Sequence, residues 1–396
     1  MASRPEERRI AFVINSLGPG GAERVLDNLL TMTPLKEWSP HLVLLDRERD
    51  FRVPPHFVTV HRLDCRFGLF ESIRQLRARL IELQPDLIVS FLVRSNVASV
   101  IAARAIGAPC IISERSQLST HMAEEYPGLK RIPAIAVPRL AYPRADHVIA
   151  VSEGVRSDLI ARFGVRPERV TSIPNPYDLG KIAQDAAAEP EFPLPQRFIV
   201  SAGRLVKRKG FDDLLDAYAR ARPPLPLCIL GEGVEQGRLT RRIEILGLSR
   251  RVCFLGYAKN PFAIVARAEM FVSPSHCEGF PNAIAEAMAL GVPVVSTDCP
   301  SGPAELLDEV ETVGAQEVHA GKYGLLVPVA RPDLLAEGIL QMSEPEAREH
   351  YSVRARKRME DYRIEAIAAR YWKTFEDVLG RSATARKRGR REPAAA

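Results

Sequence analysis

The stretch that decides the fold is 273–307, SPSHCEGFPNAIAEAMALGVPVVSTDCPSGPAELL. It opens on the end of an apolar strand, passes through the short turn 278–280, and then changes to the spacing of a helix. Pro281 stands where proline is favoured, at the first position of that helix, and Gly291 stands where glycine commonly ends one. A strand, a tight turn and a helix in this order predict one half of a parallel βαβ unit.

The same junction predicts a place for a ligand. The first turn of a helix presents unpaired backbone N–H groups and a partial positive charge, which suits a phosphate. Glu278 comes just before the helix and Glu286 follows within it, so the two carboxylates can bracket a ligand and accept hydrogen bonds from its hydroxyls. The spacing alone fits equally well if Glu278 is an ordinary surface loop residue and Glu286 an ordinary charge on the helix face. The ligand-binding interpretation and this simpler one both stay open.

Short apolar runs alternate with helical patterns along the whole chain. The candidate strands are 10–15, 41–45, 58–63, 87–91, 108–113, 147–152 and 170–174, and then 198–203, 226–231, 251–256, 270–275, 292–297 and 324–328. We therefore predict an α/β protein with two Rossmann-like, doubly wound parallel sheets facing each other across a cleft, where ligands bind at the carboxyl ends of the strands.

Composition shifts set the expected domain boundaries. Residues 176–197 hold four prolines and no clear periodicity, which predicts a linker between a first domain, 1–175, and a second, 198–360. A final helix is expected at 361–380, and the last segment, 381–396, has the composition of a basic disordered tail.

The overall composition fits a soluble protein of two domains. The chain has 396 residues, 46% of them hydrophobic and 26% charged. No apolar run reaches the roughly 18 residues that span a bilayer. The N-terminal residues are typical of a first strand rather than of a secretory signal, so we expect a cytoplasmic protein.

The positive charge is unevenly distributed. Residues 1–175 carry 24 Lys or Arg against 19 Asp or Glu, and the tail 381–396 carries six against one. A basic first half favours an anionic partner, which can be nucleic acid, an anionic membrane surface or a phosphorylated substrate. The tail has no aromatic residue among its basic ones, which argues against nucleic acid.

The six cysteines form no C-x-x-C pair, and no His or acidic cluster has metal-ligand spacing. We therefore expect thiols that are buried or free, and no metal site. A catalytic role for Cys277, beside His276, is a minor alternative.

Two further segments combine a strand end with residues that suit phosphate. In SAGRLVKRKGFDDLLDAYA (201–219), Arg204 and Lys209 leave a strand end where two cations can neutralise a diphosphate, although an ordinary basic loop is the simpler interpretation. In SLGPGGAERVL (16–26), Gly20 and Gly21 allow the backbone to approach a ligand before a helix begins.

Together these segments resemble a known family. The pattern E-G-F-P-N-x-x-x-E, preceded by G-R-x-x-x-x-K-G and followed by A-L-G-x-P-V-V-S-T-D, is similar to glycosyltransferase family 4. The resemblance implies the GT-B fold, a retaining mechanism and catalysis without a metal or other cofactor. The segments HCEGFPN and STDCPSGPAELL resemble sequences of the bacterial branch that builds lipid-linked oligosaccharides or surface polysaccharides from UDP-sugars.

The resemblance also implies roles for individual residues. Arg204 and Lys209 are expected to hold the donor diphosphate, Glu278 the hydroxyls of the transferred sugar, and Glu286 the ribose. The remaining donor contacts are expected from Gly20, Gly21, Gly279, Phe280, Pro281 and Asn282. Of these, Arg204, Lys209 and Glu278 are the candidate catalytic residues. The final helix is expected to return to the first domain.

The acceptor side departs from the family pattern. Many relatives carry a histidine in the loop after the fifth strand, whereas this loop reads ISERSQLSTHMAEE, with Glu114 and Arg115 at that place. We predict Arg115 as a contact to a phosphorylated substrate, with His121 either replacing the histidine or lying on the surface.

The sequence thus predicts a metal-independent retaining glycosyltransferase that moves a hexose or N-acetylhexosamine from a UDP-sugar, its co-substrate, to a polyprenyl-diphosphate-linked or related glycan acceptor. Contact with the anionic inner face of the plasma membrane is expected, and no nucleic acid. The alternatives are a sugar-nucleotide epimerase or phosphorylase of the same fold and, last, a nucleic-acid-binding protein without enzymatic activity.

Overall fold

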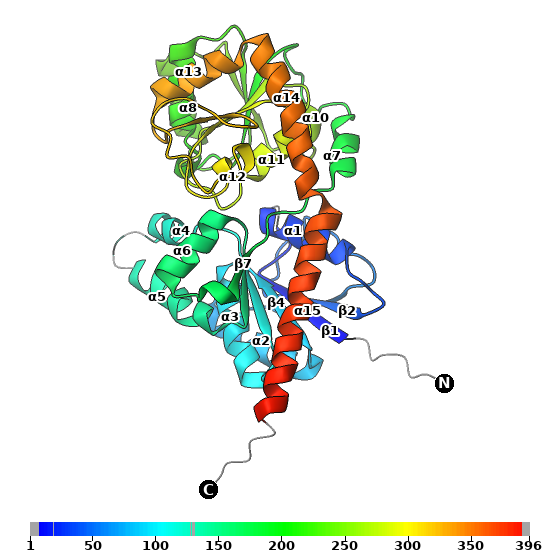
Figure 1. Cartoon of the computed structure of the whole chain (residues 1–396). Coiled ribbons are helices and arrows are strands. Elements are labelled where there is room, and N and C mark those ends of the chain that lie inside the picture. The colour runs from blue at the N-terminus through cyan, green and yellow to red at the C-terminus, as the bar shows by residue number, and fades with distance from the viewer. Residues whose placement is uncertain (1–7, 19, 127, 129–130, 390–396) are drawn as a thin grey trace. The chain divides into compact units, whose positions relative to one another are not determined.

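The computed structural model describes residues 8–18, 20–126, 128 and 131–389, which fold into two compact units (Figure 1). The first unit holds the described residues up to Val151, then Val155–Pro176 and residues 364–389. The second unit holds Tyr177–Arg363 together with Ser152–Gly154. Each unit has its own sheet and its own hydrophobic core.

The first unit is built on a seven-stranded parallel sheet in the order β3-β2-β1-β4-β5-β6-β7. Its strands are β1 (Arg8–Ile14), β2 (Trp38–Leu44), β3 (Thr59–Arg62), β4 (Leu87–Phe91), β5 (Cys110–Glu114), β6 (His147–Ala150) and β7 (Val170–Ser172). Its helices are α1 (Gly21–Thr31), α2 (Leu69–Leu83), α3 (Val93–Ile106), α4 (Leu118–Glu125), α5 (Arg131–Ala141), α6 (Glu153–Phe163) and α15 (Ile364–Gly389), with 3₁₀ turns η2 (Tyr142–Arg144) and η3 (Pro167–Arg169).

The second unit repeats this plan in the order β10-β9-β8-β11-β12-β14-β13, with only β13 antiparallel to its neighbour β14. Its strands are β8 (Ile199–Ala202), β9 (Leu227–Leu230), β10 (Val252–Gly256), β11 (Met270–Ser273), β12 (Val294–Thr297), β13 (His319–Ala320) and β14 (Leu325–Val327). Its helices are α7 (Leu179–Ala186), α8 (Phe211–Ala221), α9 (Gln236–Ile245), α10 (Pro261–Val265), α11 (Asn282–Ala289), α12 (Pro303–Leu307), α13 (Pro332–Met342) and α14 (Pro345–Met359), with η4 (Lys207–Lys209) and η5 (Glu360–Tyr362).

The strands of both sheets are continuous apolar runs in the sequence, and their burial in the structure gives the reason. Residues 10–14 of β1 and 87–89 of β4 are fully buried, because helices cover both faces of a parallel sheet. The predicted α/β class with two Rossmann-like parallel sheets is therefore confirmed. Among the described residues, no helix is both long enough and apolar enough to cross a membrane.

Helix α15 supplies much of the first unit's core, and Figure 1 shows it lying along that unit's sheet. Phe375 is fully buried, and its ring centroid lies 6.3 Å from that of Phe12 and 5.1 Å from that of Trp372. Beyond this cluster, Glu376 accepts hydrogen bonds from the Arg8 guanidinium (2.6 and 2.7 Å) and from the Trp38 indole (3.1 Å).

Two sequence predictions about chain segments were wrong. The segment 381–396 was expected to be disordered, but α15 continues to Gly389; residues 390–396 lie outside the described range. The expected linker 176–197 contains α7, which begins after Asp178, whose carboxylate accepts a hydrogen bond from the Lys181 N–H (2.8 Å). The basic composition and the prolines hid these two helical patterns.

The buried ring of Phe375 provides a test of how α15 stabilises the first unit. Phe375→Ala should lower the free energy of unfolding of that unit by about 3–5 kcal/mol, because it leaves a cavity between α15 and the sheet. The measurement is urea unfolding followed by tryptophan fluorescence, which reports on this unit alone because Trp38 and Trp372, the chain's two tryptophans, both lie in it.

The matched control is Phe70→Ala, since the Phe70 side chain is 80% exposed in the same unit. It should change the unfolding free energy by no more than about 0.5 kcal/mol. Equal effects of the two substitutions would contradict the packing described for α15.

Candidate functional site in the second unit

The donor residues predicted in the second half of the chain lie near the point where the strand order of the second sheet reverses. Strand β8 lies between β9 and β11, so the chain leaves β8 toward one side of the sheet and β11 toward the other. Ligands of doubly wound sheets bind beyond the carboxyl ends of the strands at such a switch point. The loops that follow β8 and β11 carry Arg204, Lys209 and Glu278.

The loop after β8 is a tight basic turn. Arg204 is exposed at its start, and η4 (Lys207–Lys209) ends at Gly210, which has φ +64°. A side chain at Gly210 would be doubly unfavourable, because that backbone conformation is strained for other residues and a Cβ would lie 1.9 Å from the Pro274 carbonyl oxygen. The glycine therefore lets this loop press directly against the loop that follows β11.

Polar contacts join the same two loops. The His276 N–H donates to the Arg208 carbonyl oxygen (2.8 Å), and the His276 Nε2 lies 2.7 Å from a carboxylate oxygen of Asp213. Asp213 lies in the first turn of α8, immediately after the basic turn. Gly210 is part of the G-R-x-x-x-x-K-G pattern, but the sequence alone predicted neither its close contact with the second loop nor the His276–Asp213 pair, although a glycine that ends a basic turn indicates a left-handed residue.

This docking brings Lys209 to Glu278. The Lys209 ammonium lies 2.5 Å from a Glu278 carboxylate oxygen, and the two side chains are only 20% and 11% exposed. The Lys209 side chain passes close to Gly203, whose Cβ, if present, would lie 3.6 Å from its methylene carbons. A charged pair held at a strand end offers one cation to a phosphate and one carboxylate to hydroxyl groups.

Helix α11 completes this edge. Its first residue is Asn282, so Pro281 is the residue before the helix and not its first position, as the sequence had predicted. The Phe280 ring is buried and lies 5.9 Å from the ring of Tyr362, which leaves the backbone rather than the side chain of this turn for a ligand. The Asn282 Oδ1 accepts a hydrogen bond from the Tyr177 hydroxyl (2.6 Å).

A second glycine, Gly302, packs closely against the turn before α11. Gly302 has φ +99°, and a Cβ there would lie 2.4 Å from the Pro281 ring. Glu286 is half-buried on α11, four residues after Asn282 and hence on the same helix face. The structure thus places Glu278, the turn 279–281, Asn282 and Glu286 along one strand–helix junction.

The thiols beside this junction are buried. Burial raises the pKa of the Cys299 thiol well above its usual range, and the neighbouring Glu278 carboxylate raises it further, so Cys299 is a neutral thiol. Cys277 is also buried, and its Sγ lies 3.8 Å from the Glu278 carbonyl oxygen. Within the described ranges, no group of three His, Cys, Asp or Glu side chains is placed to hold a metal ion.

The remaining predicted residues belong to the first unit. Gly20 and Gly21 lie at the start of α1, after β1, which is the strand beside that sheet's own switch point. The Arg115 guanidinium donates to the Tyr371 hydroxyl (2.8 Å), to Ser113 (3.2 Å) and to Asn175. These bonds tie the loop after β5 to α15, so Arg115 has a structural task within this unit.

His121 lies on α4 and forms an i,i+4 pair with Glu125 at 3.3 Å. This is the geometry of a helix-surface pair. The acceptor roles predicted for Arg115 and His121 stay predictions.

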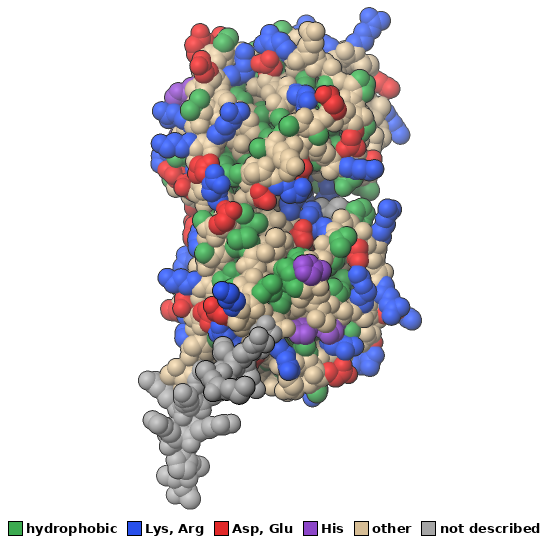
Figure 2. Space-filling model, turned by 90° about the vertical axis from the view of Figure 1, so that its right-hand side faces the viewer, with side chains coloured by type: hydrophobic (Ala, Val, Ile, Leu, Met, Phe, Trp, Pro, Cys, Tyr) green, Lys and Arg blue, Asp and Glu red, His purple; other side chains and the backbone are tan. Residues whose placement is uncertain are grey.

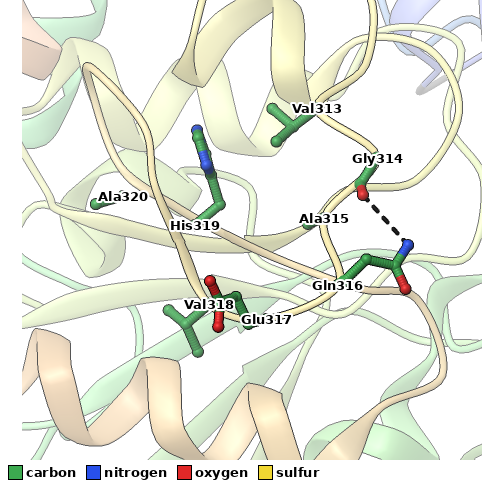
Figure 3. Close-up of a pocket in the computed structure, with 8 residues that line it drawn as sticks. All are labelled: Val313, Gly314, Ala315, Gln316, Glu317, Val318, His319 and Ala320. Carbon is green, nitrogen blue, oxygen red and sulfur yellow. Dashed lines mark hydrogen bonds between the residues drawn. The ribbon is translucent and has the colours of Figure 1, made fainter.

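Away from the strand ends, the loop 313–320 of the second unit lines a hollow, shown in Figure 3. Its lining includes none of the predicted donor residues, and the Gln316 amide donates to the Gly314 carbonyl oxygen (3.3 Å) within the loop itself. The hollow is therefore a feature of that loop and separate from the junction at Glu278.

Comparisons with known proteins agree with this architecture. The family model described as Glycosyl transferases group 1 matches residues 183–358, and the one described as Glycosyltransferase Family 4 matches residues 19–181. The structure of Anabaena HepE in complex with UDP superposes with a TM-score of 0.71 at 22% identity, over 93% of this chain and 100% of that one.

Two curated bacterial enzymes are similar in sequence. One is the N-acetylgalactosamine-N,N'-diacetylbacillosaminyl-diphospho-undecaprenol 4-alpha-N-acetylgalactosaminyltransferase of Campylobacter jejuni, 32% identical over 365 residues, which are 89% of this chain and 94% of that enzyme. The other is the lipopolysaccharide 1,6-galactosyltransferase of Salmonella typhimurium, 30% identical over 194 residues, or 46% of this chain and 53% of that enzyme.

Two Rossmann-like units, one with a basic turn and a glutamate at its switch point, define a glycosyltransferase of the GT-B class. The chain belongs to glycosyltransferase family 4, and its second unit is the group 1 glycosyltransferase domain.

The close approach at Gly210 gives a test of how the two loops are docked. Gly210→Ala should raise the hydrogen-exchange rates of the amides in 203–210 and 274–280 by about tenfold or more, because the added methyl group forces the loops apart. Hydrogen exchange measured by mass spectrometry reports both segments in one experiment.

Gly247→Ala is the matched control. Gly247 has nearly the same backbone angle, φ +68°, but nothing lies within 4 Å of its Cβ position. Exchange in the two loops should stay at the wild-type rate in this variant. Faster exchange in both variants would assign the effect to the backbone angle and contradict the close contact.

Proposed function

We propose that this glycosyltransferase is a retaining, metal-independent enzyme that transfers a hexose or N-acetylhexosamine from a UDP-sugar to a polyprenyl-diphosphate-linked saccharide or a related glycan. The observation that carries the proposal is the Lys209–Glu278 pair, held at the switch point beside the start of α11. A nucleotide sugar needs both halves of this pair, a cation for its diphosphate and a carboxylate for its sugar hydroxyls.

In the proposed complex, the diphosphate lies against Lys209, Arg204 and the N–H groups at the start of α11. Glu278 accepts hydrogen bonds from the transferred sugar, and Glu286 accepts them from the ribose. The donor contacts expected from Gly20 and Gly21 in the first unit stay predictions. The complex of HepE with UDP, a chain of the same fold, supports a uridine nucleotide as the donor's carrier.

In the proposed reaction, the main task of the protein is to stabilise the leaving group. The bond between the anomeric carbon and the diphosphate oxygen breaks, the acceptor oxygen bonds to the same face of that carbon, and the acceptor proton passes to the leaving diphosphate. Negative charge therefore grows on the diphosphate in the transition state. Fixed cations and helix N–H groups aimed at that position stabilise it without having to reorganise.

The acceptor is proposed from the sequence relatives. The Campylobacter jejuni enzyme is named for transfer to a diphospho-undecaprenol saccharide, and that protein covers nearly the whole of this chain. We therefore place the acceptor against the first unit and expect the protein to work at an anionic membrane surface. The excess of basic residues in 1–175 supports this orientation.

The direct experiment offers the protein a panel of UDP-sugars with a polyprenyl-diphosphate-linked saccharide and follows product mass, and the anomeric configuration of the product is then read by NMR. The proposal expects one saccharide unit to be added with the donor's configuration kept. Consumption of a UDP-sugar without acceptor would favour the epimerase or phosphorylase alternative, and an inverted product would contradict retention.

Removing Lys209, the cation proposed to bind the diphosphate, gives a sharper test of the site. Lys209→Ala should lower kcat by about 100-fold, because one preorganised charge is lost from the leaving group. Lys207→Ala is the control, since Lys207 is exposed in the same 3₁₀ turn and should leave kcat close to wild type. Because Glu278 loses its partner in the first variant, circular dichroism must show both variants folded; equal kcat values would then contradict the assignment.

Adding a chelator tests whether turnover needs a metal ion. If Arg204, Lys209 and the start of α11 balance the diphosphate charge, turnover should be unchanged in excess EDTA. A loss of activity that Mg²⁺ or Mn²⁺ restores would show that a metal supplies this charge instead.

A further inference from the structure

Helix α5 presents apolar side chains outward. Ile132 is 66% exposed and Leu140 is 62% exposed, whereas Pro138 and Ala141 are buried on the other side of the helix. Ile132, Ala136 and Leu140 follow one another at i,i+4 spacing, so they form one stripe along the helix. Isolated exposed apolar residues are ordinary on a protein surface, but a continuous stripe on one helix marks a contact surface.

The charge around this stripe has a single sign. Residues 126–145 contain four Lys or Arg and no Asp or Glu. Arg139 follows Ile132 by seven residues and therefore lies on the same face, and Arg131 opens the helix; both are exposed. In the part of the chain that the structure describes, no carboxylate pairs with either arginine.

The acidic residues next to this segment in the sequence are Glu124 and Glu125 before it and Asp146 after it, and the bonds that the structure gives for two of them are to groups outside α5. Asp146 accepts a hydrogen bond from the Cys110 N–H (2.8 Å), and Glu125 pairs with His121 (3.3 Å). On the face drawn in Figure 2, by contrast, basic and acidic side chains are interspersed, as on an ordinary globular surface. Among the described residues, the α5 face therefore combines an apolar stripe with two exposed arginines, Arg131 and Arg139, that no carboxylate pairs with.

We infer that the exposed face of α5 docks the protein on an anionic lipid bilayer. A helix with such a face lies in the plane of the interface, where its apolar side chains enter the boundary between headgroups and acyl chains and its arginines meet anionic headgroups. Arginine and leucine side chains at one face satisfy both requirements at once. Charge complementarity selects lipid over a second copy of this chain, because two identical faces would bring arginines together.

This inference deepens the proposed function, since a lipid-linked acceptor lies in such a bilayer. The face belongs to the first unit, in which α5 packs against α3 and α4, as Figure 1 shows. It lies on a different unit from the Lys209–Glu278 pair. Docking through α5 therefore brings the protein to its acceptor without using any residue of the donor site.

The test is sedimentation of the full chain with sucrose-loaded vesicles of phosphatidylcholine, with and without phosphatidylglycerol. Binding should need the anionic lipid and weaken with added salt. Arg139→Gln combined with Leu140→Gln should lower the partition coefficient by about tenfold or more, because one headgroup contact and one buried side chain are lost. Glutamine keeps helix propensity close to that of the residues it replaces, and both positions are exposed, so the fold is preserved.

Arg241→Gln combined with Ile245→Gln is the matched control. It removes one exposed arginine and one apolar side chain that is 76% exposed from α9 of the second unit. This variant should bind vesicles as the wild type does. Wild-type binding by the α5 variant, or an equal loss in the α9 variant, would overturn the inference, as would equal binding to pure phosphatidylcholine.

Activity separates this inference from the proposed function. With a water-soluble, short-chain acceptor and no vesicles, the α5 variant should transfer sugar at the wild-type rate. Normal transfer with lost vesicle binding supports both proposals. If the wild-type protein binds anionic vesicles through α5 but transfers no sugar, the proposed function fails and the docking surface stands.

Discussion

The close contact between Gly210 and the carbonyl group of Pro274 is the constraint on which the donor site depends. It holds two loops from neighbouring strands at a distance that no residue with a side chain would allow. The His276–Asp213 pair lies across the same boundary and fixes the loops in register. Lys209 and Glu278 meet only because these loops are docked, so a backbone contact places the charges that the chemistry requires.

The topology of the sheets explains why the site forms where it does. In each unit the first strand lies beside the fourth, β1 beside β4 and β8 beside β11, and the loops that leave them diverge. The second unit fills its switch point with a basic turn, a glutamate and the start of α11. The first unit places Gly20 and Gly21 at the equivalent strand end and extends α15 along its sheet.

The sequence predicted what depends on local pattern and missed what depends on tertiary contact. The alternation of apolar runs predicted the two parallel sheets, and the turn 278–280 with its helix predicted the junction where Glu278 lies. The family resemblance, rather than spacing, brought Lys209 into the same site. The Lys209–Glu278 pair joins residues that are distant in sequence, and its existence follows from the packing of Gly210, which no periodicity encodes. Helix α7 was missed because the surrounding prolines outweighed its cap at Asp178.

A crystal structure with an intact UDP-sugar bound would test the central claim most directly. We expect the diphosphate to lie between Lys209 and the first N–H groups of α11, with the transferred sugar hydrogen-bonded to Glu278 and the ribose to Glu286. The loops 203–210 and 274–280 should keep the contact at Gly210. A nucleotide bound away from the β8–β11 switch point, or a diphosphate without contact to Lys209, would contradict this account.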